Sequence, residues 1–231
     1  ALERRADFDR LTGLMNRDRL RGALDAALAG PARRADATVY LAIGIDTLGL
    51  VNDTMGHAAA DAVVADVARR LAAAVRAEDS IGRVGGDVFG VVMPGCGADA
   101  MAATAAALLT RVRTQPVDTP SGAVHVTVSA GGVVIGADSG SAAPTDAEAV
   151  MTQAEGALHE AKRQGRDGFW PGHATSPQQS ALRGSVAIGQ RVRAAMQADS
   201  LSFAFQPVVD GDGRVAFYEC LLNLDDGTGT P

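Results

Sequence analysis

Two apolar runs separated by a glycine pair occupy residues 81–93 and limit what the middle of this chain can form. A Gly-Gly pair supplies the positive φ angles of a tight turn, so the sequence predicts a β-hairpin with Gly85 and Gly86 at its tip. Asp87 follows the pair, where a carboxylate stays hydrated and can reach a ligand. Most acids at such turns are only solvated, so the rest of the chain decides whether this one belongs to a site.

The composition fits a globular protein with more than one folded part. With 231 residues, 47% of them hydrophobic, the chain can form one full domain and part of another. The net charge of −6 excludes a protein that coats nucleic acid, because such a protein needs a basic surface. Cys96 and Cys220 lie far apart in the sequence, which excludes a disulfide framework and zinc-binding spacing.

The sequence contains no recognisable targeting signal. No stretch resembles a secretory signal, and no apolar run approaches the ~18 residues of a membrane span. The chain begins at Ala1 in a charged stretch rather than at a methionine. We therefore expect a cytoplasmic piece of a longer protein.

Hydrophobic periodicity predicts an α/β (α+β) domain over the first 170 residues, with a central mixed sheet flanked by helices. One helix carries an apolar stripe of Leu20, Leu24 and Leu28. Asn16 or Asp18 can cap it. The other predicted elements are helices at about 58–76, 98–113 and 145–164, the last opened by a capping box, strands at 38–45, 125–135 and 167–170, and a loop at 116–122.

A change of composition marks the end of this domain. Residues 171–180 are rich in Pro, Gly, His, Ser and Gln, which is typical of a linker. Beyond them the pattern predicts a helix at about 182–197 and strands at 201–209 and 215–224. We expect a first domain in residues 1–170, a linker in 171–181 and the beginning of a second domain in 182–231.

Four motifs in order make the first domain resemble the GGDEF domains, the diguanylate cyclase family. They are Asp9-x-Leu11-Thr12-Gly13-Leu14-x-Asn16-Arg17, Val51-Asn52-Asp53-x-x-Gly56-His57-x-x-x-Asp61, Arg83-x-Gly85-Gly86-Asp87-x-Phe89 and Ala161-Lys162-x-x-Gly165-Arg166. The resemblance implies a nucleotide-cyclase palm-like fold. It also implies a reaction in which two GTP molecules condense to cyclic di-GMP across an antiparallel dimer.

The end of the chain resembles the start of an EAL domain, the cyclic di-GMP phosphodiesterase family. The similarity lies in Phe205-Gln206-Pro207-Val208-Val209 and Tyr218-Glu219-Cys220-Leu221-Leu222. It implies the first elements of a TIM-type barrel, with Glu219 as one ligand of an incomplete catalytic metal site. Asn223 replaces an arginine that usually contacts ligand phosphate, and about fifty residues cannot close a barrel, so we expect no phosphodiesterase activity from this piece.

The metal site that the first resemblance implies is depleted in this chain. The reaction needs two divalent ions held by carboxylates, and the ligands carried over are Asp87 and the backbone carbonyl of Ile45. Gly44 stands where the family has its first metal-binding Asp, and Val88 replaces a Glu implicated in catalysis. Gly44 and Asp46 share one face of a strand about 7 Å apart, so Asp46 cannot take over without a shift. We expect weakened Mg²⁺ binding, no catalytic residue beyond the remnant Asp87, and no cyclase activity.

The residues that contact the nucleotide are better preserved. By resemblance, Asn52 and Asp61 hydrogen-bond the guanine base, while Lys162 and Arg166 neutralise triphosphate oxygens. The alternative for the two cations is a solvated helix C-terminus, where positive charge suits the helix dipole.

Arg76 and Asp79 match the Arg-x-x-Asp site through which cyclic di-GMP inhibits the family's enzymes. Five residues separate Asp79 from Gly85, which is the family spacing, and Arg83 is a candidate third member. A guanidinium can bond guanine edges or phosphates, and an aspartate can accept from guanine N–H groups. A helix-end ion pair is the alternative.

These motifs predict a binding module of bacterial cyclic di-GMP signalling. It would bind cyclic di-GMP at Arg76 and Asp79, or GTP at the remnant active site, and regulate the attached EAL domain. The expected partners are a second copy of the chain, an upstream sensory domain and the complete EAL domain, with no nucleic acid. Two alternatives stay open: an active cyclase that pairs Asp87 with a substitute ligand such as Asp46, and a dimerisation module without ligand.

Overall fold

The computed structural model describes residues 7–29, 37–136, 146–172, 201–209, 211 and 214–224. The chain divides into two units, Ala1–Ser176 and Pro177–Pro231. The division falls within the stretch that the sequence predicts to be a linker. No helix in the described ranges combines the length and hydropathy needed to cross a bilayer.

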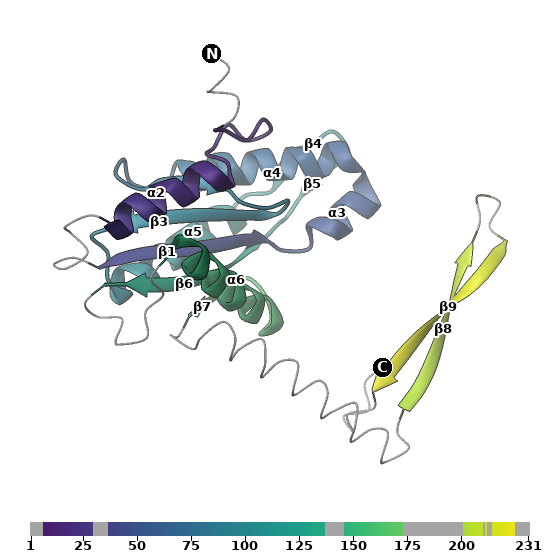
Figure 1. Cartoon of the computed structure of the whole chain (residues 1–231). Coiled ribbons are helices and arrows are strands. Elements are labelled where there is room, and N and C mark those ends of the chain that lie inside the picture. The colour runs from purple at the N-terminus through teal and green to yellow at the C-terminus, as the bar shows by residue number, and fades with distance from the viewer. Residues whose placement is uncertain are drawn as a thin grey trace. The chain divides into compact units, whose positions relative to one another are not determined.

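The first unit is built on a five-stranded mixed sheet with helices on both faces (Figure 1). The strand order is β2-β3-β1-β6-β7, in which β7 runs parallel to β6 and the other neighbours are antiparallel. The predicted sheet flanked by helices is confirmed. Its elements are α2 (Arg17–Ala29), β1 (Thr38–Ile45), α3 (Leu48–Met55), α4 (His57–Ala72), β2 (Ser80–Arg83), β3 (Val88–Pro94), α5 (Ala98–Arg113), β4 (Val117–Thr119), β5 (Gly122–Val124), β6 (Val128–Ile135), α6 (Ala147–Arg163) and β7 (Phe169–Pro171).

Strand β1 lies at the centre of the sheet. All of its residues are buried, because β3 and β6 pair with its two edges and helices cover both faces. A strand in this position reads as a continuous apolar run, which is why residues 38–45 predict it well. Its carboxyl end, at Gly44 to Asp46, lies beside the tip of the β2–β3 hairpin.

Two hydrophobic cores lie on opposite faces of the sheet. Tyr40 of β1 belongs to the core under α2 and α6, with Leu24 of α2. Leu41 belongs to the other core, with Val67 of α4 and Leu108 of α5. Successive side chains of a strand point to opposite faces, so β1 contributes to both cores in alternation.

The region after β1 differs from the sequence prediction. Residues 48–55 form helix α3 where only a short polar segment is predicted, and α4 ends at Ala72, so Arg76 follows the helix by several residues. Gly56, at φ 83° and ψ 168°, separates the two helices, because this extended, positive-φ conformation, which glycine adopts readily, breaks the run of helical residues.

The hairpin tip also differs in its turn. Gly85 and Gly86 do not have positive φ angles, so the prediction of a tight glycine turn is wrong. The N–H groups of Val84 and Gly85 both donate to the carbonyl of Val88, and the connection is therefore a wider loop that needs no left-handed residue. The hairpin itself, β2 paired with β3, is confirmed.

Two further expectations are corrected. A small hairpin, β4 with β5, replaces the loop predicted at 116–122, and β6 begins at Val128 rather than at residue 125.

Asp146 is the N-cap of α6, and its Oδ1 accepts from the Ala149 N–H at 2.8 Å. Thr145, the cap that the capping box predicts, lies outside the described residues.

The second unit contains one described antiparallel hairpin. It consists of β8 (Leu201–Val209) and β9 (Val215–Leu224), as predicted. Its described large apolar side chains are exposed: Phe203, Phe205, Phe217 and Tyr218. The helix predicted at 182–197 lies outside the described residues, and two strands do not show a barrel.

Candidate functional site

The tip of the β2–β3 hairpin is hydrogen-bonded to the end of β1. The Ile45 N–H donates to the Asp87 carbonyl at 2.9 Å, and Gly44 pairs with Val88 across the two strands. Val88 packs against the core under α2 and α6, whereas the Asp87 side chain is 38% exposed. The hairpin therefore presents the carboxylate of Asp87 beside the carboxyl end of β1.

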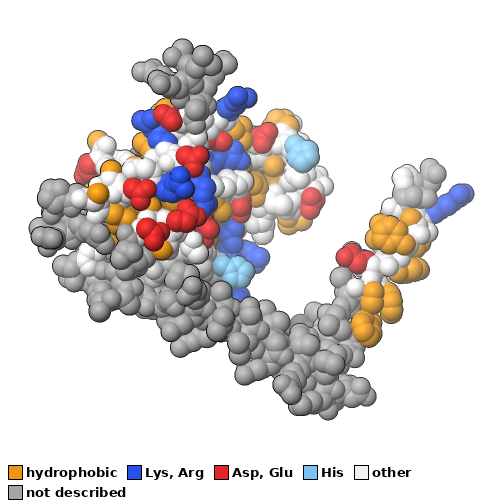
Figure 2. All heavy atoms as spheres, viewed as in Figure 1, with side chains coloured by type: hydrophobic (Ala, Val, Ile, Leu, Met, Phe, Trp, Pro, Cys, Tyr) orange, Lys and Arg blue, Asp and Glu red, His pale blue; other side chains and the backbone are white. Residues whose placement is uncertain are grey.

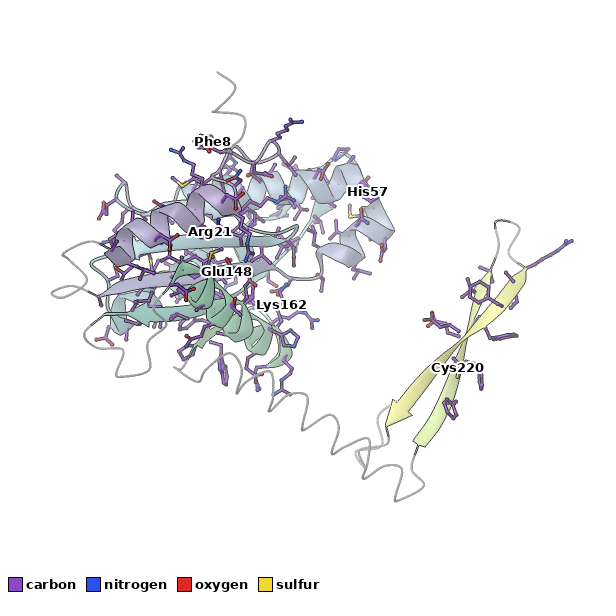
Figure 3. All side chains as sticks on the ribbon, in the orientation of Figure 1. Phe8, Arg21, His57, Glu148, Lys162 and Cys220 are labelled. Carbon is purple, nitrogen blue, oxygen red and sulfur yellow. The ribbon has the colours of Figure 1, made fainter. Side chains whose placement is uncertain are left out.

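Lys162 lies near the end of α6 (Figure 3), and its side chain reaches the same place. Its Nζ donates to Asp87 Oδ2 at 2.8 Å and to the Ile45 carbonyl oxygen at 3.3 Å. The end of the side chain passes over Gly44, where a Cβ would lie 2.9 Å from both Cε and Nζ of Lys162. The ammonium thus contacts the two oxygen donors that the family resemblance assigns to a metal.

The residues at this end of β1 do not fit a pair of divalent ions. Magnesium takes near-octahedral oxygen coordination, usually with one or two carboxylates plus substrate phosphates. Here Asp87 offers a single carboxylate that is already paired with Lys162. Within the described ranges, no group of three or more His, Cys, Asp or Glu side chains is placed to hold a metal, and this includes the exposed Glu219 of β9.

Asp46 is held by three donors and is not a free substitute ligand. Its side chain accepts from Thr127 Oγ1 at 2.7 Å, from Ser129 Oγ at 2.8 Å and from the Asp167 N–H at 3.1 Å. The residue is 2% exposed. Asp46 therefore connects β1 to β6 and to the loop after α6, a role that the sequence does not indicate.

Strained backbone surrounds Asp46. Thr47 has φ 56°, Arg166 has φ 61° and Asp167 has φ 43°. The left-handed region is unfavourable for residues other than glycine, most of all for a β-branched threonine. Since Asp46 precedes Thr47 and bonds the Asp167 N–H, its buried carboxylate fixes the loop that carries Arg166.

The residues expected to contact a nucleotide are spread around this end of the sheet. Asn52 in α3 has a buried Oδ1 without a hydrogen-bond partner in the described part of the chain, and such an acceptor is costly unless a ligand or water supplies a donor. Asp61 on α4 and Arg166 after α6 are exposed. The contacts of the described residues join Lys162 to Asp87 but join none of the other three to that pair.

An ion-pair cluster fixes α6 against α2. Arg17 of α2 pairs with Glu148 at 2.8 Å and with Glu155 at 3.2 Å, both on α6. Figure 2 shows blue and red side chains gathered over this face of the two helices. Together with the shared core beneath, the cluster fixes where α6 lies and therefore where Lys162 points.

Arg76 pairs with Asp79, and less closely with Glu78 at 3.3 Å. Nε and Nη2 of Arg76 donate to the carboxylate at 3.2 and 2.7 Å, and the Arg76 backbone N–H donates to it at 2.9 Å. The hydrogen bonds that the guanidinium donates to Asp79 raise the pKa of Arg76 above its usual range. The Asp79 side chain is 1% exposed and that of Arg76 is 46% exposed. The alternative from the sequence is an ion pair at a helix end; the two side chains do pair, but Arg76 lies beyond the end of α4 at Ala72. A ligand reaches Asp79 only after the guanidinium turns away.

Arg83 has a different place from the one expected. Its guanidinium pairs with Asp9 at 3.2 Å and donates to the Gly86 carbonyl at 2.7 Å, so it does not extend the Arg76–Asp79 pair. Burial raises the pKa of Asp9. Hydrogen bonds from Thr12 and the charge of Arg83 lower it by more, so the net pKa lies below its usual value. Arg83 thus ties the N-terminal loop to the hairpin tip. The Asp-x-x-Thr spacing is the sequence signal for this loop, because an Asp side chain accepts from backbone N–H groups shortly after it.

A known protein family and several known proteins are similar to this chain. The family described as "Diguanylate cyclase, GGDEF domain" matches residues 6–168. An uncharacterized signaling protein of Caulobacter vibrioides is 32% identical over 219 residues, which cover 94% of this chain and 26% of that protein. The bifunctional diguanylate cyclase/cyclic di-GMP phosphodiesterase MucR of Pseudomonas aeruginosa is 30% identical over 218 residues, or 94% of this chain and 31% of MucR.

A solved structure shares the fold. The GGDEF domain of DgcB from Caulobacter crescentus, in complex with c-di-GMP, has a TM-score of 0.65 at 26% identity and covers 74% of this chain and 94% of that one. The chain belongs to the diguanylate cyclase family of GGDEF domains. It spans only about a quarter to a third of the length of the curated relatives it matches.

Proposed function

We propose that this GGDEF domain lacks cyclase activity and works as a guanine-nucleotide-binding module that regulates an EAL domain beginning in residues 182–231. One observation carries the loss of catalysis: Gly44 and Val88, the two residues that replace family acids, are paired directly across β1 and β3. Both missing carboxylates therefore fall at one place. A missing general base alone typically costs 10²- to 10⁴-fold in rate.

The alternative of an active cyclase finds little support in the neighbouring acids. Asp46 is committed to three donors, and Asp87 is paired with Lys162. Incubation with GTP and either Mg²⁺ or Mn²⁺, followed by chromatography, should give no cyclic di-GMP. Turnover that Asp87→Ala abolishes would overturn the proposal.

Binding of a guanine nucleotide is supported by the orphaned Oδ1 of Asn52. A guanine N–H donor would satisfy it, and Lys162 and Arg166 would supply positive charge for the phosphates. Calorimetry should give a dissociation constant for GTP tighter than about 100 µM, weakened at least about tenfold in Asn52→Ala. Asp53→Ala, an exposed neighbour on the same helix, should leave it unchanged. Equal binding by both variants would remove Asn52 from the site.

Cyclic di-GMP at Arg76 and Asp79 is the second candidate. The half-exposed guanidinium of Arg76 favours it, and the related DgcB domain was solved with c-di-GMP. Because Asp79 is buried under the ion pair, binding must first separate the two side chains, which predicts slow association. Arg76→Ala should lower the affinity for cyclic di-GMP at least about tenfold, whereas Arg111→Ala, an exposed cation on α5, should not.

The link to an EAL domain and to a dimer is also proposed. MucR, named as both cyclase and phosphodiesterase, aligns with 94% of this chain, so the similarity extends beyond the GGDEF match.

If neither nucleotide binds tighter than about 100 µM, the remaining interpretation is a dimerisation module without ligand. Sedimentation would then show self-association that removal of the domain abolishes.

A further inference from the structure

The position of Lys162 has a consequence beyond nucleotide binding in general. Its Nζ lies on an anionic oxygen and a carbonyl oxygen, 2.8 Å from Asp87 and 3.3 Å from Ile45. Hard oxygens of these two kinds are the ligands of a divalent cation. The Lys162 side chain is 26% exposed, so it is not a freely solvated helix end.

We infer that the Lys162 ammonium replaces a divalent cation at the oxygens of Asp87 and Ile45, and that this site binds nucleotide phosphates without metal. The nucleotide part of this inference rests on the proposed function. The exclusion of metal does not, since it concerns the chain's own residues.

Gly44 makes this arrangement possible. A Cβ at residue 44 would lie 2.9 Å from the end of the Lys162 side chain and 3.1 Å from Leu158 Cδ2. Any larger side chain there, including an aspartate, would push the ammonium away from Asp87. The glycine that replaces an acid at residue 44 therefore leaves the space in which Lys162 lies against Asp87.

The charges agree with this exchange. The single negative charge of Asp87 is matched by the single positive charge of Lys162, so no divalent ion is needed to neutralise the site. An ammonium has three N–H donors, and the contacts of the described residues use two. The third, with the exposed Arg166, remains for phosphate oxygens.

Direct metal titration of the nucleotide-free chain tests the inference. Mn²⁺, followed by its paramagnetic resonance signal, should not bind to the wild type up to about 1 mM, a level at which weak oxygen-ligand sites fill. Gly44→Asp should bind Mn²⁺ below that level, because it adds a carboxylate and displaces Lys162. Binding by the wild type that Asp87→Asn removes, or no gain in Gly44→Asp that retains its circular dichroism spectrum, would overturn the inference.

A second measurement concerns the nucleotide. The affinity for GTP should be the same within about twofold in EDTA and in excess Mg²⁺. Lys162→Met should lose at least about tenfold in EDTA, whereas Arg163→Met should not, since Arg163 pairs with Glu160 instead. At least tenfold tighter binding in Mg²⁺ would contradict the inference. Absence of GTP binding in both buffers would contradict the proposed function, and the Mn²⁺ titration would still decide the metal question.

Discussion

Asp46 shows how much of the site depends on one buried carboxylate. Three donors from two other segments bond to it. The three described non-glycine residues with left-handed backbone lie beside it: Thr47 follows it in the sequence, Asp167 donates to it, and Arg166 precedes Asp167. Strained residues persist only where the surrounding structure holds them in place. The carboxylate is therefore a positioning group for the loop that carries Arg166.

Replacing Asp46 should destabilise the domain strongly. We expect Asp46→Ala to lower the free energy of unfolding by about 3 kcal/mol, because it leaves buried donors without an acceptor. Asp46→Asn should cost about half as much, since it keeps one acceptor and the hydroxyls can reorient. Urea unfolding measures both. The exposed Asp53→Ala should change stability by less than about 0.5 kcal/mol. A loss of similar size in all three variants would contradict the role of Asp46.

Asp9 should make the N-terminal loop sensitive to acid. Its pKa is lowered in the folded chain, so its contribution to stability is fully present above the pKa of the unfolded chain and is lost as the pH falls through the lower folded value. The stability difference between wild type and Asp9→Asn should be largest above about pH 5 and shrink toward pH 3. Urea unfolding across this range measures it. Arg83→Met, which removes the partner, should show the same trend, and a difference independent of pH would contradict it.

At the scale of single elements, β6 and α6 are in unusually close contact. A Cβ on Gly131 would lie 2.1 Å from the Leu158 backbone nitrogen and 2.4 Å from the Ala154 carbonyl oxygen. Backbone cannot give way as the end of a side chain can. The glycine therefore sets how closely α6 lies on the sheet, and with it the reach of Lys162.

Gly131→Ala should lower the free energy of unfolding by at least about 3 kcal/mol, because overpacking here forces a shift of the whole helix. Gly156→Ala provides a control on α6 itself. A Cβ at Gly156 meets nothing within 4 Å, so the change should raise stability by up to about 1 kcal/mol through helix propensity. Thermal and urea unfolding measure both. A tolerated Gly131→Ala would contradict the close packing of α6.

The elements with strong periodicity were the ones that the sequence could predict. The stripe of Leu20, Leu24 and Leu28 and the apolar run of β1 each match the structure. Helix α3 could not be found in this way, because Val51 is its one buried residue and a left-handed Thr47 precedes it. Short elements without a buried face have little pattern to detect.

The candidate site was predictable in its members but not in its contacts. Motif spacing singled out Asp87, Lys162 and Arg76. It could not show that Lys162 lies on Asp87, since the two are 75 positions apart and meet only because α6 packs on the sheet. Nor could it show that Asp79 is buried beneath Arg76, which depends on how the chain folds back after α4.

At the scale of the whole molecule, the described parts of the two units differ in how well they bury their apolar side chains. The buried residues of both hydrophobic cores lie between Leu20 and Leu158, within the stretch that matches the GGDEF family. In the β8–β9 hairpin, Phe203, Phe205, Phe217 and Tyr218 are each at least 60% exposed. A two-stranded hairpin alone is marginally stable in water, so these side chains need further protein to cover them.

The first unit should therefore fold without the second. We expect residues 1–176 and the 231-residue chain to unfold with midpoints within about 2 °C of each other, since every described residue of both cores lies in the shorter piece. Amide hydrogen exchange should show β1 and β6 protected near the global limit and β8 and β9 exchanging much faster, because the described large apolar side chains of the hairpin are exposed. A drop of more than about 5 °C on truncation, or strong protection of β8 and β9 in the 231-residue chain, would show that the hairpin is stabilised by the first unit.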